Sequence, residues 1–225
     1  MFFKKKCLLC SRIDDKLICI SCYNQFQKIK EPFCIICKSN INISDKNNQC
    51  VDCNLKKPLF SSLITIGAYN GLLRGVIYNL KYDGIKKLSD PLGFFLANKI
   101  KEEINYKKID FVTSIPVSLE KLKKRGFNQA ELIALSVAKN LILPYKEILI
   151  RHRETEAQHS LSKQERSENL KEAFSIKAKV NLKNKTVLII DDIFTTGATI
   201  QENCMILKEG NVSDIYVGVV SKSLM

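Results

Sequence analysis

The pattern of apolar and polar residues changes near residue 57. Beyond that point, short apolar runs bounded by turn residues alternate with longer segments whose apolar residues recur at helical spacing. Strands are predicted for the runs at 61–69, 109–117, 186–192 and 214–221. Helices are predicted for the segments at 71–84, 91–104, 128–141 and 198–210. The alternation of strands with helices predicts an α/β fold, in which helices cover both faces of a parallel sheet.

The first 57 residues lack this regular spacing and are interrupted by cysteine pairs. We therefore predict a small N-terminal module over residues 1–57 and an α/β domain over residues 58–225. Within the module, residues 23–33 are long enough for a short helix that ends at Pro32. No apolar run reaches the length of a membrane span, and no apolar stretch follows the basic N-terminus as in a signal peptide. A cytoplasmic protein without stable membrane insertion is expected.

Eight of the nine cysteines form four Cys-x-x-Cys pairs within the first 53 residues. In a chain without a secretion signal, this spacing is typical of metal ligands rather than of disulfides. Four thiolates complete a tetrahedral zinc site and leave no position open for catalysis, so the predicted zinc is structural. The pairs can be joined in sequence or crossed, and the similarity of residues 7–22 to residues 34–53 favours joining in sequence. The predicted ligands are Cys7, Cys10, Cys19 and Cys22 for one zinc and Cys34, Cys37, Cys50 and Cys53 for the other. We expect a chelator to unfold the module and to leave the α/β domain folded.

The net charge of +13, from 36 Lys and Arg against 23 Asp and Glu, is spread along the chain. It favours phosphate-rich partners, but a composition rich in Lys, Asn and Ile produces the same excess for other reasons. Charge alone therefore does not choose a function.

The stretch "VLIIDDIFTTGAT" at 187–199 combines a buried strand, two carboxylates and a glycine-containing loop. Asp191 and Asp192 are expected near the carboxyl end of the strand, where open α/β sheets bind their ligands. The loop precedes a predicted helix, whose N-terminal N–H groups and dipole favour an anion. The predicted phosphate-binding residues are Thr195, Thr196, Gly197, Ala198 and Thr199. Because the carboxylates would repel a phosphate, we expect them to face ribose hydroxyls or a magnesium ion. The alternative is structural: Asp191 and Asp192 cap a turn and Thr195 caps the helix. Capping requires only one such residue, whereas this stretch contains five.

The phosphate motifs Gly-x-x-x-x-Gly-Lys and Gly-x-Gly-x-x-Gly are both absent from the sequence. Residues 187–199 instead resemble the phosphoribosyl pyrophosphate (PRPP) motif of type I phosphoribosyltransferases. The resemblance implies that the acidic pair contacts the ribose hydroxyls, that the loop holds the 5′-phosphate and that magnesium accompanies PRPP. It also implies a pyrophosphate loop at Ser114, Ile115 and Pro116.

Three further features narrow the resemblance to the ComF family of competence-associated proteins: the cysteine module, "RGFNQAELIA" at 125–134, and residues 153–174. The last of these is similar to a family motif at Arg153, Thr155, Gln158, Leu161, Ser162, Arg166, Asn169, Leu170, Ala173 and Phe174. By the same resemblance, residues 151–170 are expected to form a lid over the site. Phe194 is bulkier than the aliphatic residue usual at its position, which predicts a narrower pocket.

The resemblance implies a PRPP-binding protein of natural transformation that handles imported single-stranded DNA together with competence or DNA-processing proteins. Residues 78–87 and 120–129 carry the cations and aromatic rings that single-strand binding uses. Tyr78, Tyr82 and Phe127 suit a stacking surface and a core equally well. No segment identifies a pocket for a base, so the sequence leaves enzymatic turnover undecided. The alternative is an active PRPP-dependent phosphoribosyltransferase of nucleotide salvage.

Overall fold

The computed structural model describes residues 6–224 except 43–45, 153–172 and 179. Its centre is a parallel sheet with the strand order β1-β6-β5-β2. A separate antiparallel pair is formed by β3 and β4. The strands are β1 (Ser62–Ala68), β2 (Phe111–Ser114), β3 (Leu149–Arg151), β4 (Phe174–Ile176), β5 (Thr186–Phe194) and β6 (Asp214–Lys222). The predicted α/β fold is thus confirmed.

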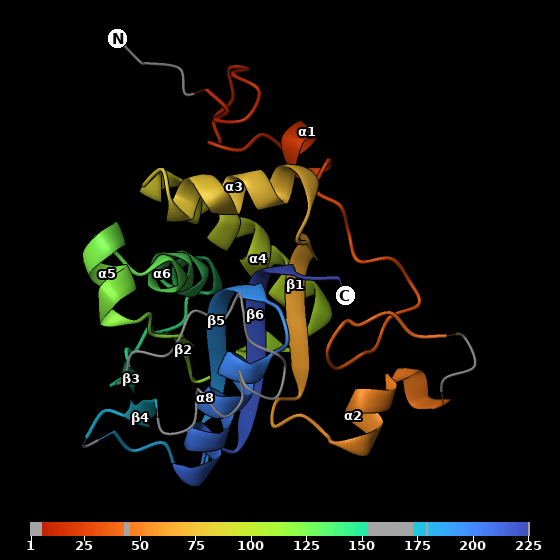
Figure 1. Ribbon diagram of the computed structural model, residues 1–225, viewed down its shortest axis with the longest axis vertical. Helices are drawn as coiled ribbons and strands as arrows, with labels where there is room; N and C mark the ends of the chain where they lie inside the picture. Colours follow the sequence, from red (N-terminus) through yellow and green to blue (C-terminus); the bar gives the residue numbers. More distant parts are fainter. Residues whose placement is uncertain (1–5, 43–45, 153–172, 179, 225) are drawn as a thin grey trace.

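Helices cover both faces of the sheet (Figure 1). One face packs against α3, α4 and α6, and the other packs against α8; we call them the α3 face and the α8 face. The helices are α1 (Ile20–Tyr23), α2 (Val51–Leu55), α3 (Gly71–Lys81), α4 (Ser89–Glu103), α5 (Leu119–Arg125), α6 (Gln129–Leu141) and α8 (Ala198–Glu209). Short 3-10 helices span Lys46–Asn48, Lys86–Leu88 and Tyr106–Lys108. Within the described ranges, no helix is both long enough and apolar enough to cross a membrane.

All eight elements predicted after residue 57 are present, with shifted ends. The strand β5 continues to Phe194, two residues beyond the acidic pair, because its backbone still pairs with β6 there. In contrast, β2 ends at Ser114, before Pro116. The helix α5 and the β3–β4 pair were not predicted, since both are short and α5 buries none of its residues.

The N-terminal segment passes along the free edge of β1 and so reaches both faces of the sheet (Figure 1). Ala68 N donates to Gln27 O at 2.7 Å, and Leu63 N donates to Ile36 O at 2.7 Å. These bonds satisfy backbone groups that an edge strand would otherwise expose. The approach is close enough to require Gly67, because a Cβ there would lie 2.5 Å from Gln27 O.

The helix expected within residues 23–33 is absent, so this prediction was wrong. The short helix α1 ends at Tyr23, and residues 27–30 have no regular secondary structure. Here the carbonyl of Gln27 is used by β1 instead of by a helix. Tertiary pairing has overridden the local preference of the segment.

Candidate functional site

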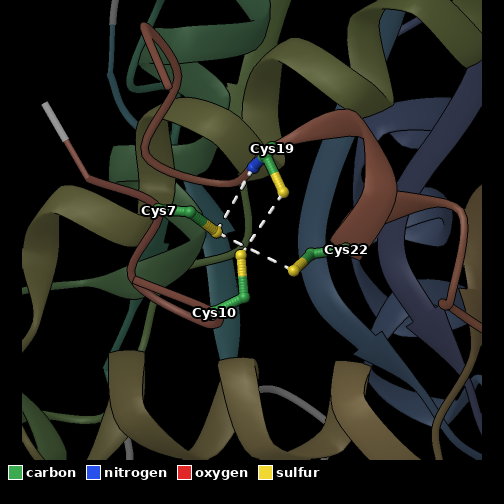
Figure 2. A group of neighbouring side chains, drawn as sticks. All are labelled: Cys7, Cys10, Cys19 and Cys22. Carbon is green, nitrogen blue, oxygen red and sulfur yellow. Dashed lines mark hydrogen bonds between the residues drawn. The ribbon is translucent and has the colours of Figure 1, made fainter. Parts of the chain in front are cut away.

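The eight paired cysteines form two clusters, joined in sequence as predicted. The sulfur atoms within each cluster lie within 4.8 Å of one another. Figure 2 shows the four side chains of the first cluster pointing at a common centre. The clusters are Cys7, Cys10, Cys19 and Cys22, and Cys34, Cys37, Cys50 and Cys53.

The geometry of both clusters fits a tetrahedral metal. A Zn–S bond of about 2.3 Å places the ligand sulfurs about 3.8 Å apart. The sulfurs of Cys7 and Cys22 are 3.8 Å apart, and those of Cys37 and Cys50 are 3.6 Å apart. Burial raises the pKa of the Cys7 thiol, but backbone N–H groups that point at its sulfur outweigh burial and lower it to about 6. Such stabilised thiolates are the form that binds metal.

Each cluster packs into a different face of the sheet. The first lies in the core of the α3 face, where Tyr23 stacks on Phe95 of α4 at a ring distance of 3.9 Å. The second lies in the core of the α8 face together with Phe60, whose ring meets that of Phe194 edge-on at 6.3 Å. The ammonium of buried Lys222 sits 5.7 Å from the same Phe194 ring. The second cluster therefore connects through packed side chains to the loop that follows Phe194.

The loop at 114–116 adjoins the acidic pair at the carboxyl edge of the sheet. Ser114 pairs in register with Ile190, and Ile115 N donates to Ile190 O at 3.0 Å. The acidic pair begins at the next residue, Asp191, so it directly adjoins the loop at 114–116. The structure thus brings the sequence-predicted residues into one region.

The loop at 114–116 is held by its neighbours. The hydroxyl of Ser114 lies 2.9 Å from Tyr145 Oη, and burial raises the pKa of Tyr145 to about 12. Asn128 Nδ2 donates to Ile115 O at 3.0 Å while its Oδ1 caps α6. Pro116, the last residue of this loop, is half-buried. The loop is therefore tied to α6.

The two carboxylates of the acidic pair point to opposite faces of the sheet. Along β5, Ile189 packs on the α8 face and Ile190 on the α3 face. Alternation therefore directs Asp191 toward the α8 face and Asp192 toward the α3 face. Asp191 is half-buried, whereas Asp192 is only 4% exposed. The sequence did not distinguish between the two residues.

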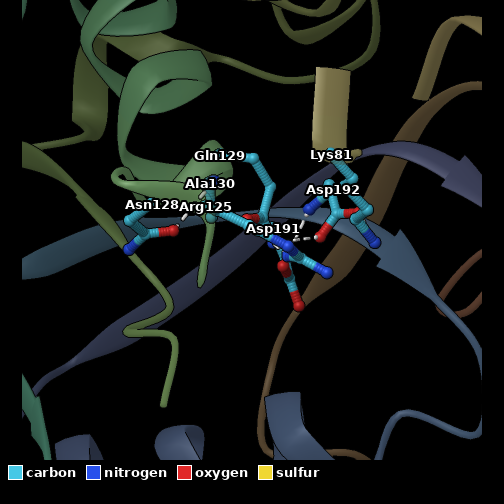
Figure 3. A network of polar contacts seen from close by, with 7 residues as sticks. All are labelled: Lys81, Arg125, Asn128, Gln129, Ala130, Asp191 and Asp192. Atoms are coloured by element: carbon cyan, nitrogen blue, oxygen red, sulfur yellow. Dashed lines mark hydrogen bonds and ion pairs between the residues drawn. The ribbon is translucent and has the colours of Figure 1, made fainter. Parts of the chain in front are cut away.

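Asp192 is held by side chains that sequence reasoning missed (Figure 3). Lys81, the last residue of α3, forms an ion pair with Asp192 Oδ2. Gln129, the first residue of α6, donates to Asp192 Oδ1 at 3.2 Å. Arg125 Nη1 in turn donates to Gln129 Oε1 at 2.9 Å. The only sequence signal for this network was the family-like segment at 125–134.

The network shifts the pKa values of the two carboxyl groups in opposite directions. Burial acts to raise the pKa of Asp192, but the Lys81 ammonium and the side-chain hydrogen bonds to this carboxylate together outweigh burial and lower it. Burial and the charge of Asp192 together hold the pKa of Asp191 well above its usual range. Burial also acts to lower the pKa of Lys81, but the nearby Asp192 carboxylate raises it overall. The region thus contains one compensated carboxylate and one carboxyl group that takes up a proton readily.

The loop at 195–199 leads into the N-terminus of α8, as predicted. Thr195 is exposed, and Thr196 and Thr199 are half-buried. Gly197 adopts φ 79° and precedes Ala198, the first residue of the helix. The Phe194 ring lies beneath Gly197 and is 8% exposed, so it packs in the core. Phe194 therefore shapes the loop from below, and the expected narrowing of the pocket does not follow from its position.

Gly197→Ala is expected to destabilise the loop more than backbone strain alone would. The left-handed conformation costs roughly 1–2 kcal/mol for a residue with a Cβ, and that Cβ would also lie 2.5 Å from Phe194 Cζ. Gly84→Ala is the matched control, because Gly84 has φ 67° but open space around it. Thermal melts should show a larger loss of stability for Gly197→Ala. Equal losses would mean that the Phe194 contact does not constrain the loop.

The structure separates the three aromatic residues that the sequence left undecided. Phe127 is 7% exposed and packs in the core of the α3 face. Tyr78 and Tyr82 are each 54% exposed. Only the two tyrosines are available to a partner.

Most of the family-like motif at 153–174, with most of the expected lid at 151–170, lies outside the described residues. Its last two residues are described: Ala173 and Phe174 are both buried. Phe174 pairs with Arg151 across β3 and β4. The described residues Arg151 and Phe174, on either side of the undescribed range 153–172, therefore lie next to each other.

The chain is similar to several known proteins. Residues 124–222 match the phosphoribosyl transferase domain family. The chain is 32% identical to competence protein ComFC of Streptococcus pneumoniae, over 92% of this chain and 89% of that protein. It is 25% identical to the DNA utilization protein YhgH of Escherichia coli, over 97% and 90% of the two chains. Among solved structures, the glutamine PRPP amidotransferase of B. subtilis is 21% identical, with a TM-score of 0.41 over 58% of this chain and 25% of that one.

The resemblance drawn from sequence motifs is thus confirmed by overall similarity. The cysteine clusters, the parallel sheet and the acidic pair belong to one chain that aligns with the streptococcal protein over nearly its whole length. The protein is a member of the ComF family, with a phosphoribosyltransferase-like domain behind an N-terminal segment whose cysteine clusters can hold metal ions.

Proposed function

We propose that the carboxyl edge of the sheet binds PRPP or a related ribose phosphate. The observation that carries this proposal is the meeting of three features at one edge: the acidic pair, the loop at 195–199 and the loop at 114–116. A helix N-terminus suits the 5′-phosphate, and carboxylates accept hydrogen bonds from ribose hydroxyls.

The two carboxylates have different roles in this proposal. Asp191 points to the α8 face, where α8 begins. In the proposed complex it accepts a hydrogen bond from a ribose hydroxyl. Asp192 is neutralised by Lys81, so it holds Lys81 and Gln129 in position for the ligand. The pairing keeps the edge from presenting two uncompensated negative charges to a phosphate.

Four cations converge near the acidic pair and support a pyrophosphate subsite. Partial desolvation of its side chain lowers the pKa of Lys121, and the positive charges of Arg151, Arg125 and Lys81 add to this effect. Cations that disfavour one another in this way are stabilised by a polyanion. Magnesium bound with PRPP would supply further neutralisation of the pyrophosphate, next to the loop at 114–116.

The same protein is proposed to handle single-stranded DNA during natural transformation, in the cytoplasm and together with competence or DNA-processing proteins. Its relatives are named for competence and for DNA utilization. The net charge of +13 suits a nucleic-acid partner. Exposed lysines of α5 lie just beyond the loop at 114–116, so a bound strand would pass the mouth of the site.

The alternative is an active phosphoribosyltransferase of nucleotide salvage, favoured by the match to the transferase domain family. In that case a nitrogen nucleophile would displace pyrophosphate at the anomeric carbon of PRPP. Release of pyrophosphate from PRPP with a panel of bases and amines would establish this alternative.

Titration calorimetry with PRPP and magnesium tests the ligand. Saturable binding that requires the acidic pair is expected. If PRPP does not bind, or if the double variant Asp191→Asn/Asp192→Asn binds it as well as the wild type while folded, the proposed ligand site is wrong.

Reversal of Lys123 and Lys124 to Glu is expected to weaken single-stranded DNA binding strongly. Both lysines are exposed in the last turn of α5, so stability should change little. Each lost phosphate contact should lower the salt slope by roughly 0.7. Fluorescence anisotropy of a labelled oligonucleotide across a salt series measures both quantities, and PRPP affinity should persist.

The matched control reverses Lys107 and Lys108, two exposed neighbours that precede β2 as Lys123 and Lys124 follow it. The control places the same charge change at the amino edge of the sheet. Equal losses of DNA affinity in both variants would mean that total charge, and not α5, governs binding.

A further inference from the structure

Two tyrosines form an exposed aromatic pair at the end of α3. Tyr78 and Tyr82 are four residues apart, which places them on one side of the helix. Their ring centroids are 4.8 Å apart, with an angle of 41° between the ring planes. Each residue is 54% exposed, and neither belongs to a core cluster. Exposed aromatic surface of this kind is a feature of binding sites.

The pair lies at the rim of the proposed ribose phosphate site. Lys81, which directly precedes Tyr82, turns inward to the ion pair with Asp192 (Figure 3). Arg125 provides a second connection, since its guanidinium lies 5.2 Å from the centre of the Tyr82 ring. The same guanidinium donates to Gln129, which donates to Asp192.

The surroundings of the pair combine positive charge with exposed apolar surface. The neighbouring helix α5 carries Lys121, Lys123 and Lys124, all exposed, and ends at Arg125. It also exposes Leu119 by 59% and Leu122 by 40%. Residues 78–87 and 119–125 contain only two carboxylates, Asp83 and Glu120. Lysines and arginines therefore outnumber acidic residues in these two ranges. Flat aromatic faces among cations suit the bases and phosphates of an unpaired strand.

We propose that Tyr78, Tyr82 and Arg125 form a stacking subsite for an unpaired nucleobase of single-stranded DNA, beside the ribose phosphate site. This inference rests on the proposed DNA-handling function and adds the element that receives a base. Bases present a flat π-face that stacks on tyrosine and on a guanidinium plane, whatever their sequence. Bases within a duplex are already stacked on each other, so the subsite selects single strands.

The chain contains no tryptophan, so a single introduced tryptophan reports on its own position. In Tyr82→Trp, stacking of a base on the indole should quench most of the fluorescence when an oligothymidylate binds. A duplex of equal length should quench it little. Tyr106→Trp is the control, because Tyr106 adjoins Lys107 and Lys108 at the other end of the sheet. It therefore has similar charge nearby but is not part of the Tyr78–Tyr82 ring pair. Equal quenching of both variants by the single strand, or none in Tyr82→Trp at saturation, overturns the subsite.

Removal of the rings tests the same subsite by affinity. Tyr78→Ala/Tyr82→Ala should lower single-strand affinity roughly five- to hundredfold, whereas Tyr78→Phe/Tyr82→Phe should retain most of it. Both variants should melt near the wild type, because the rings are exposed. If the alanine variant binds the strand normally while the reversal of Lys123 and Lys124 abolishes binding, the subsite is wrong and the DNA-handling function stands. If the wild type binds no single strand at any salt concentration, the DNA-handling function itself fails, and the subsite with it.

Discussion

Removal of metal from this protein is expected to unfold the N-terminal segment and also to destabilise the α/β core. Structural zinc in small modules contributes about 10–16 kcal/mol of apparent binding free energy to folding. Cys7, Cys19 and Cys22 pack in the core of the α3 face, and the second cluster packs in the core of the α8 face. Loss of either metal therefore opens part of the core. The sequence had suggested a module that could unfold alone.

Elemental analysis should find about two zinc ions per chain. Cys7→Ser/Cys10→Ser should retain one zinc and increase amide hydrogen exchange in α3 and α4. Cys34→Ser/Cys37→Ser should also retain one, with faster exchange in β1 and around Phe194. Cys204→Ala is the control: Cys204 is the ninth cysteine, is buried in α8 and belongs to neither cluster, so zinc content should not change.

One zinc or none in the wild type would contradict the two-site prediction. A chelator that leaves the melting of the α/β core unchanged would show that the clusters do not support it.

Neutralisation of the acidic pair is expected to have opposite effects on stability at its two positions. Asp192→Asn leaves the largely buried Lys81 without its counter-charge, which should cost about 3–5 kcal/mol. Asp191→Asn should hold or raise stability at neutral pH, because the fold disfavours ionised Asp191. Ribose phosphate affinity should fall roughly tenfold or more in both variants. Asp191→Asn replaces an acceptor oxygen for the ribose hydroxyl, and Asp192→Asn releases Lys81 and Gln129.

The pH dependence separates the two carboxylates. The folded-state pKa of Asp192 is lowered, so its stabilisation is present above the unfolded pKa and is lost as pH falls through the folded pKa. The folded-state pKa of Asp191 is raised, so its stabilisation is complete below the unfolded pKa and is lost as pH rises through the folded pKa. The gain from Asp191→Asn should therefore grow from acidic to neutral pH in thermal melts.

Two controls make this prediction specific. Lys81→Met/Asp192→Asn removes both charges and should recover stability without recovering ligand affinity. Glu102→Gln breaks the surface pair with Lys99, where Glu102 is 62% exposed, and should change stability by less than about 1 kcal/mol. If Asp192→Asn is no more destabilising than Glu102→Gln, the buried ion pair does not stabilise the fold.

The sequence by itself determined the fold class, the cysteine clusters and the position of the acidic pair along the chain. These features are local. The apolar period reports whether a segment is a strand or a helix, and the buried run at 187–190 must be followed by residues near the carboxyl edge. The similarity of the two cysteine segments favoured clusters within residues 7–22 and 34–53 over crossed pairs, and the structure confirms these clusters.

The tertiary structure alone decided which groups meet through space. Lys81 and Gln129 reach Asp192 from two different helices, and no local pattern encodes that meeting. The carbonyl of Gln27 pairs with the edge of β1, where the sequence predicted a helix at 23–33, and this long-range backbone pairing leaves no local signal. Tyr82 and Phe127 have similar aromatic character in sequence, but tertiary packing buries Phe127 in the core of the α3 face and leaves Tyr82 exposed. Exposure depends on what the rest of the chain covers, which is why the acidic network and the aromatic pair became visible only in the folded protein.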